Sequence, residues 1–224
     1  MPDPSILVAH RGFAGKFPEN TLEALSEAVK LGVTKVEFDV QFTKDLVPVM
    51  LHDTSLFRTT GLDASIFSLN LSEVENVNSV SDVMVWLKAN PEVRTFVELK
   101  PESIEEHGLL RCVKTLAEAC SPAISQCVFI SFDASACGLA KAQGFEKMGW
   151  ILPSYNDIIL NVIKGLKPDY VFCDTEYIPE GLETLEQGEY EWIMYEVANR
   201  DLAKSMMLKG ADYLESKELD ELIG

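Results

Sequence analysis

Short runs rich in Val, Ile and Phe alternate with segments of helical period along the whole chain. The pattern predicts strands at 6–10, 35–42, 95–100, 127–132, 148–152, 170–173, 192–197 and 211–216. It predicts a helix after each of them, at 20–32, 79–90, 104–120, 133–144, 156–167, 179–189, 199–210 and 217–224. Repeated strand–helix units favour an α/β fold with a parallel sheet, and eight units favour a (βα)8 TIM barrel over an open sheet.

One strand-like run, PVMLH at 48–52, has no helix of its own. The five residues TKDLV that join it to the second strand are too few for a parallel crossover. We therefore expect an antiparallel hairpin extension that brings Asp39 roughly opposite His52. The following segment, 61–79, is expected to be a short surface insertion. No linker, charge block or repeat divides the chain, so 1–224 is predicted to be one domain.

Charge and hydropathy restrict the partners. The formal net charge of −17 argues against nucleic acid and against general attraction to anionic membranes, although a metal ion or a local Arg can still reverse the sign inside a site. No apolar stretch approaches the roughly 20 residues of a membrane span, and the first residues do not form a secretory signal. The five cysteines include no Cys-x-x-Cys pair and are expected to be reduced packing residues. A cytoplasmic protein without stable membrane association is predicted; its oligomeric state is left open.

Polar residues gather where the predicted strands end, which in a TIM barrel is the shared mouth that carries active sites. They are His10 and Arg11 after the first strand, Glu37 and Asp39 on the second, His52 and Asp53 after the hairpin return, and Glu98 and Lys100 on the next strand.

Glu37 and Asp39 are two residues apart in VEFDV, so both side chains point to one face and the apolar neighbours point to the other. Glu98 repeats this pattern in FVELK. Three carboxylates that converge on one mouth make a hard-oxygen site suited to Mg²⁺ or Ca²⁺. The alternative is that they are solvated strand ends paired with Lys or Arg.

Two histidines beside these carboxylates add a general acid and a general base, and Arg11 and Lys100 add anion-binding groups. That set suits transfer at a phosphorus centre, where charge on the equatorial oxygens must be neutralised. The histidines could instead ligate a transition metal. His107 is interpreted as an ordinary exposed helical residue.

FPENTLEAL begins the first predicted helix. Asn20 is expected to cap it, with Glu23 at the capping-box position. Glu19 precedes the cap and has three possible roles: binding a substrate hydroxyl, ordering the first histidine, or a favourable interaction with the first helical turn.

In their order, these residues closely resemble the glycerophosphodiester phosphodiesterase family. The matching motifs are His10-Arg11-Gly12, Pro18-Glu19-Asn20-Thr21, Glu37-Phe38-Asp39, Thr43-Lys44-Asp45, His52-Asp53, Arg58-Thr59-Thr60, Glu98-Leu99-Lys100 and Ser131-Phe132. The resemblance implies a TIM barrel with a divalent cation held by Glu37, Asp39 and Glu98.

The resemblance also implies that His10 and His52 share acid and base duty while Arg11 and Lys100 hold the phosphate. The family hydrolyses glycerophosphodiesters to an alcohol and glycerol 3-phosphate. A neighbouring glycerol hydroxyl attacks phosphorus, and water then opens the cyclic phosphate. Which histidine is the first base is left open.

The C-terminal half departs from the family pattern. Tyr195 stands where the family has Trp, with Glu196 next to it; Glu215-Ser216 replaces a closing Thr-Asp, and Leu46 replaces a Gly. These changes affect the walls that would select glycerol and head group, where Tyr195 is a candidate substrate contact and Glu196 could favour a cationic alcohol. Two alternatives stay open: a lysophospholipase D-type enzyme using LDASIFSLNL as an apolar surface, and a non-catalytic phosphodiester-binding barrel.

Overall fold

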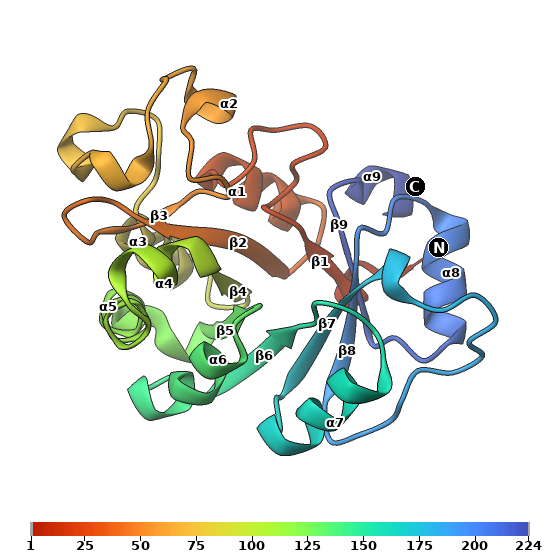
Figure 1. The fold of residues 1–224 in the computed structure, drawn as a ribbon. Helices are drawn as coiled ribbons and strands as arrows, with labels where there is room; N and C mark the ends of the chain where they lie inside the picture. Colours follow the sequence, from red (N-terminus) through yellow and green to blue (C-terminus); the bar gives the residue numbers. More distant parts are fainter. Residues whose placement is uncertain (1, 224) are drawn as a thin grey trace.

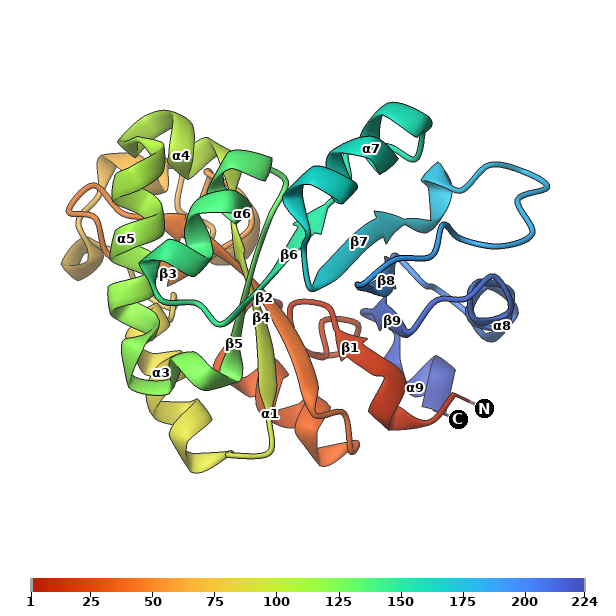
Figure 2. The same ribbon diagram turned by 90° about the horizontal axis from the view of Figure 1, so that it is seen from below.

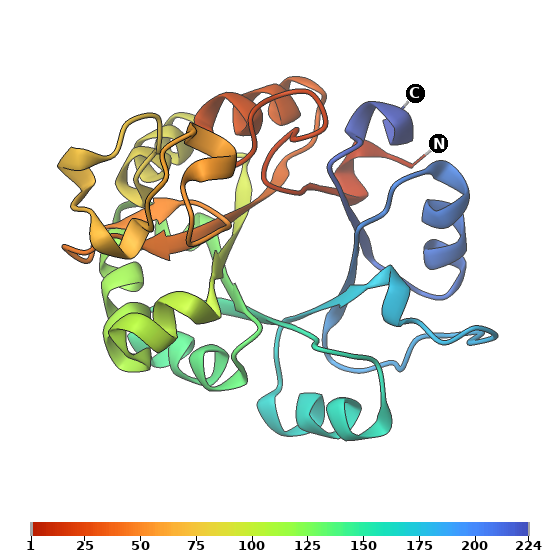
Figure 3. The same ribbon diagram turned by 45° about the horizontal axis from the view of Figure 1, so that its top comes forward.

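The computed structural model (Figure 1) describes residues 2–223, in which eight parallel strands form a closed ring. These strands are β1 (Leu7–Ala9), β2 (Lys35–Phe42), β4 (Arg94–Leu99), β5 (Cys127–Ser131), β6 (Lys147–Ile151), β7 (Tyr170–Asp174), β8 (Glu191–Tyr195) and β9 (Tyr213–Ser216). Their order around the sheet is β1-β9-β8-β7-β6-β5-β4-β2, and pairing of β1 with β2 closes the barrel (Figure 3). The predicted TIM barrel is confirmed.

Helices surround this ring. They are α1 (Leu22–Lys30), α3 (Val80–Ala89), α4 (Pro101–His107), α5 (Leu109–Cys120), α6 (Ala134–Ala140), α7 (Asp157–Leu166), α8 (Arg200–Leu208) and α9 (Leu219–Ile223). Figure 2 shows α4, α5 and α6 outside β4 and β5. Short 3-10 helices lie at Pro4–Ile6, Ile66–Ser68, Leu71–Glu73, Ser121–Gln126, Lys141–Gln143 and Thr175–Tyr177. None of the helices in residues 2–223 is long and apolar enough to cross a bilayer.

The helix predicted at 179–189 is wrong. After β7 the chain forms only the 3-10 turn Thr175–Tyr177 and then runs without regular structure to β8. Pro179, Gly181 and Gly188 interrupt this segment, and Gly181 has a φ of 86°. Residues of these two types disfavour a helix interior, so the helical spacing of the leucines did not suffice.

The predicted hairpin is present. β3 (Pro48–Met50) pairs antiparallel with β2, with Val40 opposite Met50. The amide of Leu51 donates to the carbonyl of Asp39 at 3.1 Å, so His52 lies one residue beyond the position opposite Asp39. The insertion that follows contains α2 (Phe57–Thr60) and lies beside the barrel mouth (orange and yellow in Figure 3). It packs on its own small core, made of Val49, Leu51, Leu56 and Ile66.

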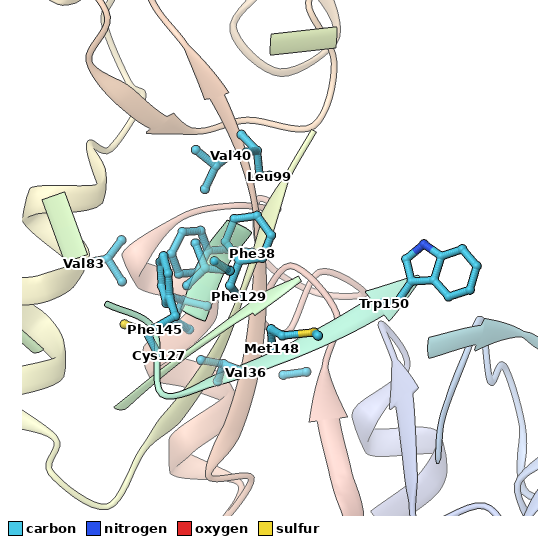
Figure 4. Close-up of a cluster of buried hydrophobic side chains, with 14 of the residues drawn as sticks. Val36, Phe38, Val40, Val83, Leu99, Cys127, Phe129, Phe145, Met148 and Trp150 are labelled. Carbon is cyan, nitrogen blue, oxygen red and sulfur yellow. The ribbon is translucent and has the colours of Figure 1, made fainter. Parts of the chain in front are cut away.

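The main core lies between strands and helices. Val36, Phe38 and Val40 of β2 are fully buried there (Figure 4). A separate apolar cluster fills the lumen, formed by Val8, Phe96, Val128, Ile130, Ile151, Tyr170, Phe172 and Ile193. The alternation predicted for β2 therefore holds, and its polar residues are left to face the upper lumen.

Candidate functional site

A small cavity of about 110 Å³ opens at the carboxyl ends of the strands. Seven of the predicted site residues line it: His10, Arg11, Glu37, His52, Glu98, Lys100 and Tyr195. Glu196 and Glu215 line it as well. Asp39 touches this set through Arg11 and Lys100, whereas Glu19 lies at the edge of a neighbouring cavity.

Glu37, Asp39 and Glu98 come from the neighbouring strands β2 and β4, where Asp39 and Glu98 are directly paired. One carboxylate oxygen of each lies within 4.8 Å of the others. Their exposed fractions are 1%, 0% and 7%. Three buried carboxylates this close together repel one another unless positive charge lies between them.

Part of that charge comes from the chain itself. Lys100 donates to Glu98 at 2.7 Å and lies 3.4 Å from Asp39, and the Arg11 Nε lies 3.1 Å from Asp39. Burial alone would raise the pKa of Asp39, but Lys100 and Arg11 overcome it and lower the pKa to about 2. For Glu98, burial and Asp39 prevail and raise the pKa to about 7. Burial and neighbouring carboxylates also raise the pKa of Glu37.

The carboxylate oxygens of this set fit a metal ion. Glu37 Oε1 and Asp39 Oδ1 are buried and have no hydrogen-bond partner among residues 2–223, although Lys100 Nζ lies 3.4 Å from Asp39 Oδ1. Carboxylate oxygens are the ligands that Mg²⁺ and Ca²⁺ prefer, and an ion among them favours the charged forms of the three side chains.

Asn20 positions Asp39 and does not cap α1, so that prediction is wrong. Its Nδ2 donates to Asp39 Oδ2 at 2.8 Å, and its Oδ1 accepts from the Asp39 amide at 3.0 Å. Thr21 caps the helix instead by accepting from the amide of Ala24. Asn20 has a φ of 54°, a left-handed conformation that Asn tolerates well, and this turns its side chain into the barrel.

His10 directly follows β1 and is 7% exposed. Burial, followed by the charge of Arg11, lowers its pKa to about 3, so the imidazole is neutral near pH 7. Its Nδ1 lies 3.7 Å from Glu196 Oε1. The next residue, Arg11, has a φ of 56° and its amide donates to Glu37 Oε2 at 2.9 Å. The first turn after β1 thus fixes an imidazole, a guanidinium and a carboxylate together.

His52 contacts a chain of charged side chains across the mouth. Its Nδ1 lies 2.6 Å from Asp53, whose other oxygen accepts from Arg58 at 2.6 Å. Arg58 also donates to Glu19 at 2.7 Å, and Arg11 donates to the same Glu19 oxygen at 3.2 Å. Of the three roles considered for Glu19, none describes this bridge between two arginines.

Two further positioning residues were not singled out from the sequence. Gln41 donates to the carbonyl of His52 at 3.0 Å and accepts from Ser103 at 2.5 Å, which connects β2 to the hairpin and to α4. Arg58 lies in the Arg-Thr-Thr motif, and this was the available signal for its role. Gln41 follows the alternation of Glu37 and Asp39, so the same inward-facing pattern could have found it.

His107 is not an ordinary exposed residue. It is half-buried at the end of α4, and its ring lies edge-on to Phe67 and Phe42, with centroids 5.5 and 6.2 Å away. The insertion covers a position that the helix alone would leave open. His107 therefore serves packing outside the site.

The C-terminal strands supply the departures from the family pattern. Tyr195 ends β8, and Glu196 follows with a φ of 58° and a side chain 46% exposed. Glu196 is paired with Lys217 at 3.0 Å. Glu215 of β9 is 3% exposed and points into the lumen.

A second cavity of about 750 Å³ adjoins His52. Its lining is mostly polar: Glu19, Asn20, Thr21, His52, Arg58, Thr59, Thr60, Asn76 and Asn78, with Pro18, Met50, Leu51 and Val77. Together the two cavities present clustered carboxylates that could hold a cation, an Arg and a Lys that could bind an anion, two imidazoles, and room for a polar group beside them. This arrangement can bind and polarise a phosphoryl group.

Comparison with known proteins gives the same indication. The model of the glycerophosphoryl diester phosphodiesterase family matches residues 10–133, more than half of the chain. Human glycerophosphodiester phosphodiesterase 1 is 29% identical over 166 residues, which are 74% of this chain and 44% of that protein. The rat protein of the same name is 41% identical over 75 residues, 34% of this chain and 23% of its own length. The chain spans less than half the length of these relatives.

Solved structures share the fold. A phosphodiesterase of Oleispira antarctica, in complex with the product sn-glycerol-3-phosphate, superposes with a TM-score of 0.81 at 22% identity and covers 96% of this chain and 94% of its own. A glycerophosphodiester phosphodiesterase of Thermotoga maritima gives a TM-score of 0.76 at 22% identity, with 96% of each chain covered. With the family match and the ordered motifs at the barrel mouth, the chain belongs to the glycerophosphoryl diester phosphodiesterase family.

Proposed function

We propose that this barrel hydrolyses glycerophosphodiesters to an alcohol and sn-glycerol 3-phosphate. The observation that carries the proposal is the buried triad Glu37, Asp39 and Glu98, whose carboxylate oxygens converge beside a cavity that both His10 and His52 line. The product found in the Oleispira antarctica relative supports the choice of substrate.

Glu37, Asp39 and Glu98 would hold the divalent cation, Mg²⁺ or Ca²⁺. When bound, such an ion supplies positive charge for the phosphate oxygens and lowers the pKa of a hydroxyl beside it. Arg11 and Lys100 add two fixed positive charges at the same cavity, and Asp39 keeps both in place. The transferring phosphoryl group would thus meet positive charge that requires no rearrangement.

His10 and His52 would move the protons. A glycerol hydroxyl next to the phosphodiester forms the new P–O bond and gives its proton to one histidine, while the other protonates the departing alcohol as its P–O bond breaks. Water then opens the cyclic phosphate with the proton transfers reversed. His10 and His52 both line the cavity, and Asp53 holds the His52 ring by its Nδ1.

The shape of the site favours small polar diesters. The cavity beside His52 is lined by hydroxyl, amide and charged groups, which match a soluble head group better than an acyl chain. Tyr195 would contact the substrate from the opposite wall. The proposal includes action in the cytoplasm, which the net charge of −17 supports because it opposes attachment to anionic lipid.

One observation favours lysophospholipids as a second candidate. Phe57 and Leu62, near the larger cavity, are 64% and 43% exposed. However, Ile66 of the same apolar stretch is fully buried in the core of the insertion. The exposed apolar surface is therefore small, and glycerophosphodiesters remain the first choice.

The test compares release of the alcohol from glycerophosphocholine and from lysophosphatidylcholine with Mg²⁺ or Ca²⁺ present. We expect preference for glycerophosphocholine, and a loss of about 10²–10⁴-fold in His10→Ala because one proton-transfer group is gone. Glu37→Ala should lose a similar or larger factor, while Glu106→Ala on the exposed face of α4 should match the wild type. Absence of release from both substrates, or full activity in Glu37→Ala, would overturn the proposal.

A further inference from the structure

A second group of metal-ligand atoms lies beside the first. His10, Glu37 and Glu215 each offer one atom within 4.8 Å of the other two, and all three side chains are buried. Glu37 lies in β2, Glu215 lies in β9, and His10 directly follows β1, which pairs with both of these strands. Glu37 belongs to both groups, so the two candidate positions share a carboxylate.

The polar atoms of this second group are without partners. His10 Nδ1, Glu37 Oε1 and Glu215 Oε1 are buried and make no hydrogen bond within residues 2–223. Glu215 is 3% exposed and Glu37 is 1% exposed, so both carboxylates are largely removed from bulk solvent. Buried polar atoms of this kind cost free energy unless a ligand or a proton satisfies them.

The two cationic side chains of the site form ion pairs with carboxylates other than Glu215. Arg11 pairs with Asp39 and Glu19, and Lys100 pairs with Glu98 and Asp39. In the described part of the chain, no Lys or Arg lies within ion-pair distance of Glu215. Four carboxylates thus share one lumen with two cations, and Glu37 and Glu215 are the two that form no ion pair with either of them.

We propose that His10, Glu37 and Glu215 form a second divalent-cation position, with Glu37 bridging the two ions. One imidazole and two carboxylates suit Mn²⁺ or Zn²⁺ better than Ca²⁺, which takes oxygen ligands only. The inference rests on the proposed function insofar as it shares Glu37 with the first metal position.

This position has a consequence for activity. An ion bound there takes a lone pair of His10, which the proposed reaction needs for proton transfer. The first ion therefore activates and the second inhibits. We expect activity to rise with the first equivalent of Mn²⁺ and to fall at least tenfold as the second position fills.

The direct test counts Mn²⁺ bound to the metal-stripped 224-residue chain by equilibrium dialysis. We expect two equivalents for the wild type and one for Glu215→Gln, because the amide keeps the shape but loses the charged ligand. The matched control is Glu196→Gln, which changes a carboxylate 3.7 Å from His10 that is exposed and paired with Lys217; it should still bind two. Electron paramagnetic resonance should show coupled Mn²⁺ pairs only where two equivalents bind.

One equivalent in the wild type, or two in Glu215→Gln, would overturn the second position and mean that a proton satisfies Glu215. No bound Mn²⁺ at all would overturn the first position as well, and with it the metal-dependent function. If Glu215→Gln does not fold, the number of Mn²⁺ ions bound by the wild type still tests the second position.

A second experiment uses NMR spectroscopy. The chain has three histidines, so the ¹⁵N ring signals of His10 can be assigned with His10→Asn. Saturating Zn²⁺ should shift them, and unshifted signals would contradict the proposal.

Discussion

At the scale of single residues, the site depends on how firmly Asp39 is held. Asn20 fixes its carboxylate and its amide, while Lys100 and Arg11 approach its two oxygens. A ligand oriented in this way loses little conformational entropy when a metal binds, and partners of this kind typically change metal affinity by about 10–100-fold. Asn20 thus acts through Asp39 without touching the phosphate itself.

Replacement of Asn20 by Ala tests this role. We expect Asn20→Ala to weaken Mg²⁺ or Ca²⁺ binding by about 10–100-fold, as measured by calorimetry on the metal-stripped protein. Thr21→Ala, which removes the neighbouring helix cap, should cost about 1 kcal/mol of stability and leave the metal affinity nearly unchanged. Equal affinity losses in both variants would show that the helix, and not Asn20, orients Asp39.

The pairing of Asp53 predicts a pH dependence of stability. The hydrogen bond from Arg58 lowers the pKa of Asp53 to about 2, below its value near 3.9 in an unfolded chain. The contribution is therefore present above pH 4 and is lost as the pH falls toward 2. Because both side chains are partly exposed, we expect less than about 1 kcal/mol. The difference in free energy of unfolding between wild type and Asp53→Asn should shrink below pH 4; a difference independent of pH would contradict the pairing.

Residue types alone located most of the candidate site. The spacing of Glu37 and Asp39 and the repeat at Glu98 placed three carboxylates on inward faces, where they lie. Asn20 was misassigned because Asn and Thr are both good caps and adjacent, and only the turn after β1 decides between them. Glu215 could not be assigned, because its isolation from Lys and Arg depends on the closed barrel.

At the scale of elements, the β1–α1 connection sets the position of His10 and Arg11. Arg11 and Gly12 have φ values of 56° and 76°, so the chain reverses within two residues. A Cβ at Gly12 would lie 2.6 Å from the backbone carbon of Ala24. The loop is therefore pressed directly onto the first turn of α1.

Replacement of Gly12 by Ala should displace this loop. We expect Gly12→Ala to lower the free energy of unfolding by at least about 2 kcal/mol, from the left-handed φ and the overlap together, and to reduce activity with it. Gly61 is the matched control because its φ is 77° and a Cβ there meets nothing within 4 Å. Urea unfolding should give Gly61→Ala only the backbone cost, about 1 kcal/mol; equal losses would contradict the role of close packing.

Helices and strands could be predicted where the hydrophobic periodicity agreed with the positions of Gly and Pro. β2 and β3 were placed with a register one residue from that found, because five connecting residues leave little freedom. The helix at 179–189 failed because Pro179 and two glycines outweigh the leucine spacing. His107 was misjudged because the insertion that covers it has no periodic pattern from which its packing could be predicted.

At the scale of the molecule, the apolar residues that stabilise the barrel and the polar residues of the candidate site lie in different parts of it. The layer between strands and helices and the lower lumen are apolar, whereas four carboxylates lie at the upper lumen. Like charges in a buried place destabilise the metal-free fold, and a cation there relieves this. The pairing of β1 with β2 closes the barrel and brings these charges together. The eight strand–helix units in the sequence predicted this closure.

Chelation should therefore lower the thermal stability. With Mg²⁺ or Ca²⁺ at about 100 times its dissociation constant, binding to the native state adds about 2.7 kcal/mol, which for a chain of this size is roughly 5–10 °C in melting temperature. Calorimetry with EDTA and with added metal measures it. Glu98→Gln should show a clearly smaller rise, and an equal rise in that variant would place the ion elsewhere.

The most direct test of the account is a metal titration of catalysis. Purified, metal-stripped protein is supplied with glycerophosphocholine, and release of glycerol 3-phosphate is followed as Mg²⁺ or Ca²⁺ is added and then removed with EDTA. We predict release that starts with added metal, stops with EDTA and is absent from Glu37→Ala. Release that continues unchanged in EDTA, or its absence with every metal, would contradict a metal-dependent phosphodiesterase.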